Sequence, residues 1–171
     1  LATLVDDLQA LALADAGALN VVKEPLRLAE LIEQIAESFR DRLANRGITL
    51  ELQLERDLTV TADPHRLRQL LHNLLENSVR YVEDDGRVRL TLSGGHGVGL
   101  VLDDSGPGVD EALLPQLFDR FFRVEGSRSR ATGGAGLGLA ICRNIVEAHG
   151  GTIEAAHSEL GGLAIRIGLP E

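Results

Sequence analysis

The sequence has few residues that could cross-link the chain or bind a metal through sulfur. Its 171 residues include one cysteine, no tryptophan and no methionine, and only 3% of them are aromatic. The lone cysteine, Cys142, excludes a disulfide framework and any metal site built from several cysteines. Because aromatic residues are so rare, we expect one globular domain whose core consists almost entirely of leucine, valine, isoleucine and alanine.

Excess positive charge and long apolar segments are also missing. The chain carries 17 Lys+Arg against 26 Asp+Glu, a formal net charge of −9. Binding to a nucleic-acid backbone depends on clustered lysine and arginine, so this charge argues against a nucleic-acid partner. The longest apolar runs, such as VGLVL and LGLAIC, are far shorter than the roughly 18 residues that a membrane-spanning helix needs. We therefore expect no direct membrane contact by this chain.

The absence of methionine also bears on where the chain begins. A translation product starts with methionine, whereas this chain starts at Leu1 within a helix-like pattern. We therefore expect a fragment of a longer protein, and expectations about targeting or membrane segments apply to the fragment alone.

The first 19 residues form a region of their own. Their apolar residues recur at intervals of three and four, which predicts an amphipathic helix with one face that needs a partner. The partner could be the chain's own domain, but the linker-like segment NVVKEP that follows favours a separate dimer-forming element. The residues on this face are Leu1, Leu4, Val5, Leu8, Leu11 and Ala12.

Residues 20–171 mix helical and strand patterns. Asp63 and Pro64 supply an N-cap and a first-turn proline for a long helix. Because the strands are mostly joined as hairpins, the sequence predicts an α/β sandwich, with a mixed, largely antiparallel sheet covered on one face by helices. Helices are expected at about 29–46, 64–82, 110–118 and 136–149, and strands in ITLELQL, TVTA, RVRLTLSGG, GVGLVLDDS, GTIEAAH and GLAIRIGL.

The helix at 64–82 carries a polar face that cannot belong to a core. At about 100° per residue, Asn73, Asn77 and Arg80 fall together, with Tyr81 at the edge and the leucines roughly opposite. Two asparagine oxygens one turn apart suit Mg²⁺, which keeps water and phosphate as its other ligands. Taken alone, however, these residues fit an ordinary solvated face better.

A glycine-rich turn follows the strand GVGLVLDD. In it, Asp104, Gly106 and Gly108 form D-x-G-x-G. The carboxylate can accept amino hydrogens of a base, while the glycines let a planar ring approach the backbone. Taken alone, the segment is first of all a turn.

A second glycine motif, GGAGLGLAI, lies where an irregular loop becomes a helix. Its glycines, Gly134, Gly136 and Gly138, would free backbone amides at the helix N-terminus to bind phosphate. The motif is neither a P-loop nor a dinucleotide fingerprint, because the lysine and glycine positions that those require are absent.

Between the glycine motifs, arginines and phenylalanines gather in FDRFFRVEGSRSR. Four arginines in so acidic a chain suggest that something anionic docks there, and a solvated basic loop is the alternative. They are Arg120, Arg123, Arg128 and Arg130, beside Phe118, Phe121 and Phe122.

The order of these motifs is more informative than any one of them. LLHNLLENSVRY, DDSGPG, LFDRFFR and GGAGLGLAI resemble the N, G1, F and G2 boxes of the catalytic ATP-binding domain of sensor histidine kinases, in the GHKL superfamily. The resemblance spans residues 20–171 and implies a Bergerat fold, while residues 1–19 resemble the C-terminal end of a dimerisation helix in the same kinases. The segment RVEGSRSRATGGAGLGLAICRNIVEAHGG is particularly similar to the BaeS-type envelope-stress sensors.

The resemblance implies a role for each motif. Asp104 would hydrogen-bond the adenine amino group, Asn77 would ligate Mg²⁺, and Arg123 would contact phosphate from a lid that a triphosphate orders. Asn73, Asn77 and Arg123 form the implied catalytic set. The other implied nucleotide-binding residues are Asn73 and Arg80 near the phosphates, Tyr81, Gly106 and Gly108 around adenine, and Gly134, Gly136, Leu137 and Gly138 at the lid, which Phe118, Phe121 and Phe122 would anchor by burying themselves.

Two positions depart from the patterns of the superfamily. In the gyrase, HSP90 and MutL branches a glutamate one turn before the Mg²⁺ asparagine is a general base. Here that position is Asn73, so hydrolysis should be poor. Glu76 lies about 100° from Asn77 on the helix and is a poor replacement. In the last glycine box, Leu163 and Ala164 stand where a hydroxyl is usual, which argues against a side-chain hydrogen bond to adenine from that strand.

The resemblance implies an enzyme that transfers the γ-phosphoryl group of Mg·ATP to a histidine. None of the five histidines lies in a phosphoacceptor motif, so the acceptor is expected upstream of Leu1. The implied partners are the parent protein's own dimerisation and histidine phosphotransfer helices, in a homodimer, and a response regulator, at the cytoplasmic side of the bacterial inner membrane.

Two alternatives remain at this point. One is a GHKL serine kinase or ATPase, and the other is a degenerate nucleotide-sensing dimer module. The leading helix argues against the serine kinases, and the intact boxes argue against degeneracy.

Overall fold

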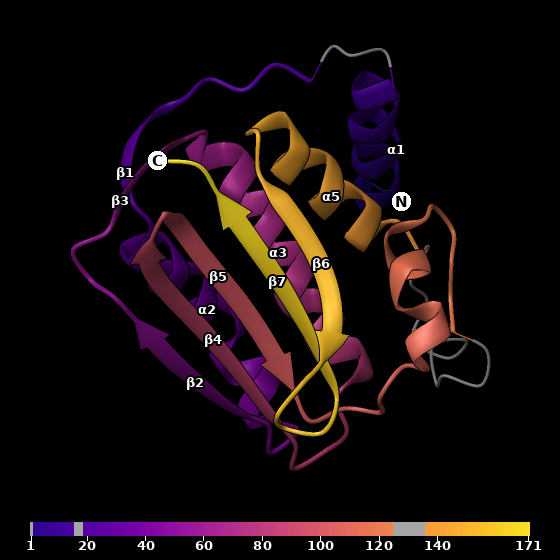
Figure 1. Ribbon diagram of the computed structural model, residues 1–171. Coiled ribbons are helices and arrows are strands. Elements are labelled where there is room, and N and C mark those ends of the chain that lie inside the picture. Colours follow the sequence, from indigo (N-terminus) through magenta and orange to yellow (C-terminus); the bar gives the residue numbers. More distant parts are fainter. Residues whose placement is uncertain (1, 16–18, 125–135) are drawn as a thin grey trace.

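The computed structural model describes residues 2–15, 19–124 and 136–171. Its main element is a five-stranded sheet in the order β2-β4-β5-β7-β6 (Figure 1). The neighbours β2 and β4 run parallel and the other neighbours antiparallel, and a second sheet pairs β1 with β3. The strands are β1 Glu24–Arg27, β2 Thr49–Leu54, β3 Thr59–Ala62, β4 Arg87–Gly95, β5 Gly97–Asp104, β6 Thr152–His157 and β7 Leu163–Leu169.

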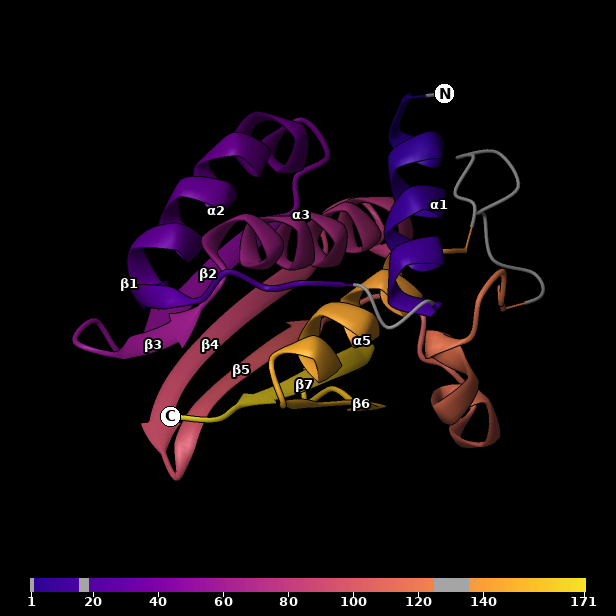
Figure 2. The same cartoon turned by 90° about the horizontal axis from the view of Figure 1, so that it is seen from above.

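Helices cover one face of the large sheet and leave the other open. Figure 2 shows α2, α3 and α5 in a layer on one side of the strands, whereas Figure 1 looks onto the side without helices. The predicted sandwich with a mixed, largely antiparallel sheet is therefore confirmed. The helices are α1 Ala2–Asp15, α2 Leu28–Ala44, α3 Pro64–Tyr81, the 3-10 helix η1 Glu111–Phe118, and α5 Gly138–Ala148.

The leucine stripe of α3 decides which way its polar residues point. Leu70, Leu71 and Leu74 are each 1% exposed and belong to the same core as Leu90 and Leu100 of the sheet. On a helix with a period of 3.6 residues, a face filled in this way leaves the polar residues directed away from the core. The predicted asparagine face is therefore available for a ligand.

Asp63 fixes where α3 begins. Its Oδ1 accepts hydrogen bonds from the backbone N–H groups of His65 at 3.0 Å and Arg66 at 3.2 Å, which is the predicted N-cap. Its Oδ2 accepts from the backbone N–H of Val22 at 3.0 Å. The backbone N–H of Asp63 donates to Nε2 of His149 at 3.0 Å. This one residue therefore ties together the segment before α2, the start of α3 and the end of α5.

We expect Asp63→Ala to lower the free energy of unfolding by about 1–2 kcal/mol at neutral pH, because it removes an N-cap. Burial acts to raise the pKa of Asp63, but the backbone donors of Val22, Arg66 and His65 bring it below its ordinary value. The stabilisation is therefore present above the ordinary pKa of about 3.9 and is lost as the pH falls through the lower folded value.

Urea unfolding between about pH 3 and pH 7 measures this cost. Asp63→Asn is the matched control, because it keeps a capping oxygen without a titrating charge and should lose only the pH dependence. A cost of Asp63→Ala that stays constant across the whole range would contradict the assignment.

The segment read as a linker and the short helix both differ from prediction. NVVKEP runs into β1, which pairs antiparallel with β3 from Glu24 opposite Ala62 to Arg27 opposite Thr59. The helix expected near 110–118 is a 3-10 helix with Pro115 inside it. A proline removes a backbone donor and clashes with the preceding turn of an α-helix, which accounts for the tighter form.

The apolar face of α1 is only partly covered. Leu11 is buried and α1 lies against α5, but Leu4, Val5 and Leu8 are 40–51% exposed. The helix thus contacts its own domain and still presents apolar side chains to solvent. We still predict that residues 1–19 belong to a dimerisation helix and residues 20–171 to a catalytic domain.

Within the described ranges, no helix combines the length and the apolar character that crossing a bilayer requires.

Candidate functional site

The end of β5 lies directly against the end of α3. A Cβ added to Gly106 would lie 3.4 Å from the backbone oxygen of Tyr81 and 3.6 Å from Cα of Val82. Gly106 therefore lies within van der Waals reach of the end of α3. The fold thus brings the D-x-G-x-G turn to the same place as the polar face of α3, although the two are separate in the sequence.

Asp104 is the buried carboxylate of this corner. It is 9% exposed, and its Oδ1 accepts hydrogen bonds from the backbone N–H groups of Gly106 at 2.9 Å and Leu163 at 3.1 Å. Burial raises the pKa of Asp104, and these two backbone donors offset part of that effect. Among the residues that the structure describes, both hydrogen bonds to the carboxylate reach Oδ1, which leaves Oδ2 to accept a donor from a ligand.

Gly162 is a site residue that sequence reasoning missed. A Cβ at this position would lie 2.2 Å from Oδ1 of Asp104 and 2.6 Å from the backbone nitrogen of Gly106. Its backbone N–H donates to the backbone oxygen of Asp104 at 3.0 Å. Only a residue without a side chain can approach so closely. The signal in the sequence was the Gly-Gly pair that opens the last glycine box.

The departures in that box have a structural explanation. Leu163 donates its backbone N–H to Oδ1 of Asp104, and this hydrogen bond needs no side-chain hydroxyl. Ala164 is 1% exposed and pairs with Asp103 across β5 and β7. That neither side chain donates a hydrogen bond to adenine stays a prediction.

The polar face of α3 holds one unsatisfied group. Asn73, Asn77, Arg80 and Tyr81 are all partly exposed. Within the described part of the chain, the buried amide nitrogen Nδ2 of Asn73 has no hydrogen-bond partner. A buried donor without an acceptor costs about 1–3 kcal/mol, so this group favours a ligand that supplies an acceptor.

Glu76 is engaged elsewhere. Its two carboxylate oxygens accept from Nη1 and Nη2 of Arg42, at 2.8 Å and 2.9 Å. The hydrogen bond from Arg42 lowers the pKa of Glu76 below its ordinary value. A carboxylate held in this way is a weak proton acceptor and a poor substitute for a general base.

We therefore expect Glu76→Gln to leave the basal rate of ATP hydrolysis unchanged. Loss of a true general base would lower that rate by about 10²–10⁴-fold. Phosphate release measured on purified wild type and Glu76→Gln separates the two cases. A variant slowed a hundredfold while its unfolding curve matched wild type would reassign Glu76 as the base.

The start of α5 carries the second predicted glycine motif. Gly136 adopts φ +73°, and a Cβ there would lie 3.0 Å from Cα of Phe121. The backbone N–H of Phe121 donates to the backbone oxygen of Gly136 at 3.0 Å, which joins the two ends of the predicted lid. At Gly138 an added Cβ would meet no described atom within 4 Å. Leu137 is 1% exposed, so its side chain belongs to the core and only its backbone can face a ligand.

The prediction that all three phenylalanines are buried was wrong for one of them. Phe118 is buried and Phe122 is half-buried, but Phe121 is 62% exposed. Phe121 has φ +61°, and its backbone is held by Gly136. The turn that this backbone requires directs the ring outward. Arg123 is half-buried, whereas Arg128, Arg130 and Gly134 lie outside the described residues.

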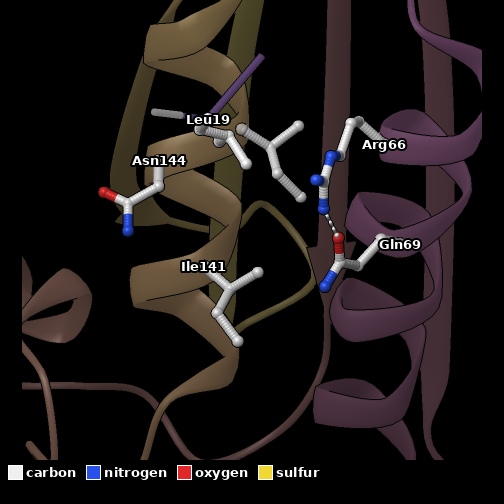
Figure 3. Close-up of a pocket in the computed structure, with 6 residues that line it drawn as sticks. Leu19, Arg66, Gln69, Ile141 and Asn144 are labelled. Carbon is white, nitrogen blue, oxygen red and sulfur yellow. Dashed lines mark hydrogen bonds between the residues drawn. The ribbon is translucent and has the colours of Figure 1, made fainter. Parts of the chain in front are cut away.

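A hollow elsewhere on the molecule contains none of the predicted site residues. It lies between the first turns of α3 and the middle of α5, where Nη1 of Arg66 donates to Oε1 of Gln69 at 3.2 Å (Figure 3). Its other lining residues are Leu19, Ile141, Asn144 and Ile145.

Across the described ranges, no cluster of three or more His, Cys, Asp or Glu side chains is placed to hold a metal ion.

Comparison with known proteins agrees with the arrangement of these motifs. Residues 62–171 match the family described as histidine kinase-, DNA gyrase B-, and HSP90-like ATPase. The chain is 51% identical over 173 residues to the signal transduction histidine-protein kinase BaeS of Escherichia coli strain K12. That match covers 99% of this chain and 37% of BaeS, so the chain spans less than two fifths of this relative.

Solved structures give the same result for the fold. Full-length ShkA in complex with AMPPNP superposes with a TM-score of 0.84 at 33% identity, over 98% of this chain and 35% of ShkA. Histidine kinase ThkA in complex with the response regulator protein TrrA superposes with a TM-score of 0.78 at 25% identity, over 98% of this chain and 48% of that one.

Proposed function

The chain belongs to the histidine kinase-, DNA gyrase B- and HSP90-like ATPase family, and on this basis we propose that it catalyses the transfer of the γ-phosphoryl group of Mg·ATP to a histidine on a separate helical segment. As an ATPase-type domain of sensor kinases it binds ATP.

The arrangement around Asp104 carries the proposal. Two backbone donors fix Oδ1, and Oδ2 is left to accept the amino hydrogens of adenine. Burial in a low-dielectric corner strengthens such a hydrogen bond. Gly106 and Gly108 leave room beside it for a planar ring, and Tyr81 would line the same pocket from α3.

The phosphates would lie along α3 towards the start of α5. Asn73 offers a buried donor that lacks an acceptor, Arg80 offers a positive charge, and the first amides of α5 at Gly138 offer a helix N-terminus. The Asn77 oxygen fits Mg²⁺, which when bound would neutralise charge on the phosphates. Arg123 would reach the phosphates from the lid.

The same residues favour transfer over hydrolysis. Water attack needs a general base near the γ-phosphate, but Asn73 cannot take a proton and Glu76 is held by Arg42. Phosphoryl transfer instead depends mainly on positioning and charge neutralisation, which this set of donors can supply. The kinase reading therefore fits better than the ATPase alternative.

The proposed partner is the histidine-bearing helix pair of the parent protein, in a homodimer. The exposed face of α1, with Leu4, Val5 and Leu8, suits packing among such helices. A response regulator as second partner has support from ThkA, which was solved with one. We place the parent protein at the cytoplasmic side of the bacterial inner membrane, which is the location that the resemblance of the motifs to sensor histidine kinases implies.

A phosphotransfer assay tests this proposal. The chain is incubated with Mg·[γ-³²P]ATP, alone or with a separately expressed helix pair from a BaeS-like kinase that carries the phosphoacceptor histidine. We expect acid-labile label on the helix pair and none on the chain alone. Acid-stable label would indicate a serine kinase, and no nucleotide binding at millimolar ATP would indicate a degenerate module. Either result would contradict the proposal.

A further inference from the structure

Asp103, the neighbour of Asp104, belongs to a polar network on the open face of the sheet. Successive strand side chains point to opposite faces, so Asp104 faces the helices and Asp103 the open side. Asp103 is nevertheless only 7% exposed. Its Oδ2 accepts from Nη2 of Arg89 at 3.2 Å, and its Oδ1 accepts from the hydroxyl of Ser158 at 2.8 Å. A carboxylate buried this deeply needs such partners, because an unpaired buried charge is costly.

Ser158 connects this network to the turn between β6 and β7, residues 158–162. Its hydroxyl oxygen accepts from the backbone N–H of Leu160 at 3.0 Å. Its backbone N–H donates to the oxygen of Gly162 at 2.9 Å, and its backbone oxygen accepts from Gly161 at 3.0 Å. The turn therefore closes around Ser158, and Asp103 holds the side chain of Ser158 in place.

The far end of the same turn holds Asp104. The backbone N–H of Gly162 donates to the backbone oxygen of Asp104 at 3.0 Å, and that of Leu163 donates to its Oδ1 at 3.1 Å. Two neighbouring aspartates therefore hydrogen-bond to the same turn, Asp103 to its first residue and Asp104 to its last. Loosening the turn at Ser158 would also loosen the donor that orients the Asp104 carboxylate.

We propose that Ser158, held by Asp103 and Arg89, is a positioning residue that fixes the Asp104 carboxylate against the base of a bound nucleotide. The inference rests on the proposed function, because it requires that Asp104 reads adenine. Adenine presents an amino donor where guanine presents a carbonyl acceptor, so a fixed carboxylate accepts the first base and repels the second. A carboxylate free to turn loses part of this discrimination.

Competition of ATP and GTP against a fluorescent nucleotide tests the role of Ser158. Ser158→Ala should weaken ATP binding by about three- to tenfold, which corresponds to one net hydrogen bond. GTP affinity should not fall, because a looser carboxylate repels guanine less, so the ATP-to-GTP selectivity should drop by at least the same factor. Ser158→Thr keeps the hydroxyl and should restore selectivity. Glu154→Ala is the matched control, because it removes the Glu154–Arg166 pair at 3.7 Å on the same face and should behave like wild type.

The possible failures can be told apart. A Ser158→Ala protein with wild-type selectivity, beside an Asp104→Asn protein that has lost it, would overturn the positioning role and leave the proposed function standing. An equal loss for ATP and GTP would indicate general damage to the site and would also overturn it. If Asp104→Asn keeps full selectivity, the proposed function itself fails. Arg89→Gln removes the arginine that contacts both Asp103 and Glu159 of the turn, each at 3.2 Å, and unchanged selectivity there counts against the proposal.

Discussion

Asp104→Asn should weaken ATP binding by about 1–3 kcal/mol, which is a factor of about 5–150 in Kd. In the folded chain, Gly106 and Leu163 both donate to Oδ1 of this carboxylate. The other oxygen is left to accept an adenine amino hydrogen. In the variant an amide NH₂ would face that amino group, and two donors repel each other. Isothermal titration calorimetry with Mg·ATP measures the loss.

The same substitution should not destabilise the fold. Burial raises the pKa of Asp104, and the nearby charge of Asp103 adds to the rise. A raised folded pKa means that stability is present below the ordinary pKa of about 3.9 and is lost as the pH rises through the folded value. Asp104→Asn removes this cost and keeps an oxygen for the two backbone donors, so its free energy of unfolding at neutral pH should equal or exceed that of wild type.

This pair of measurements separates a binding residue from a structural one. Lower stability with unchanged ATP affinity would make Asp104 structural only. We expect the variant to bind ATP more weakly while its free energy of unfolding stays at least that of wild type, because Asp104 is buried in order to bind the nucleotide.

Asn77→Ala should abolish the Mg²⁺ dependence of ATP binding while the fold survives. Mg²⁺ prefers oxygen ligands and keeps several waters, so a single amide oxygen beside the phosphates can be the protein's whole contribution. Asn77 is partly exposed on α3, and the leucines that stabilise this helix lie on another face. Titrations with ATP in the presence of Mg²⁺ and of a chelator measure the dependence.

Gln69→Ala is the matched control for this variant. Gln69 lies on the same helix, two turns earlier, and bonds Arg66 rather than facing the proposed phosphates. It should retain the full enhancement of ATP binding by Mg²⁺. An Asn77→Ala protein with wild-type enhancement would move the metal site elsewhere.

Elements with strong local signals could be predicted from the sequence. Asp63 and Pro64 mark the start of α3, the leucine period sets its buried face, and glycine marks the turn between β4 and β5. The strand patterns also predicted the positions of β2 to β7. The resemblance to histidine kinases of the BaeS type, which depended on the order of the boxes, is confirmed by the 51% identity.

The features that could not be predicted depend on contacts between distant residues. The strand β1 has four residues, including Pro25, and exists because it pairs with β3 more than 30 residues later. Gly162 is required because Asp104 lies so close to it, and the Gly-Gly pair alone does not show which distant residue makes the glycine necessary. Phe121 looked apolar enough to be buried, but its backbone conformation is set by Gly136.

Hydrogen exchange of the whole chain with and without Mg·AMPPNP locates the nucleotide most directly. We expect protection of amides at 104–108 after β5, in the last turn of α3 and in the first turn of α5. The hollow lined by Arg66, Gln69 and Asn144 should show little change. Protection concentrated at that hollow, with residues 104–108 exchanging as in the free chain, would contradict the placement of ATP at Asp104.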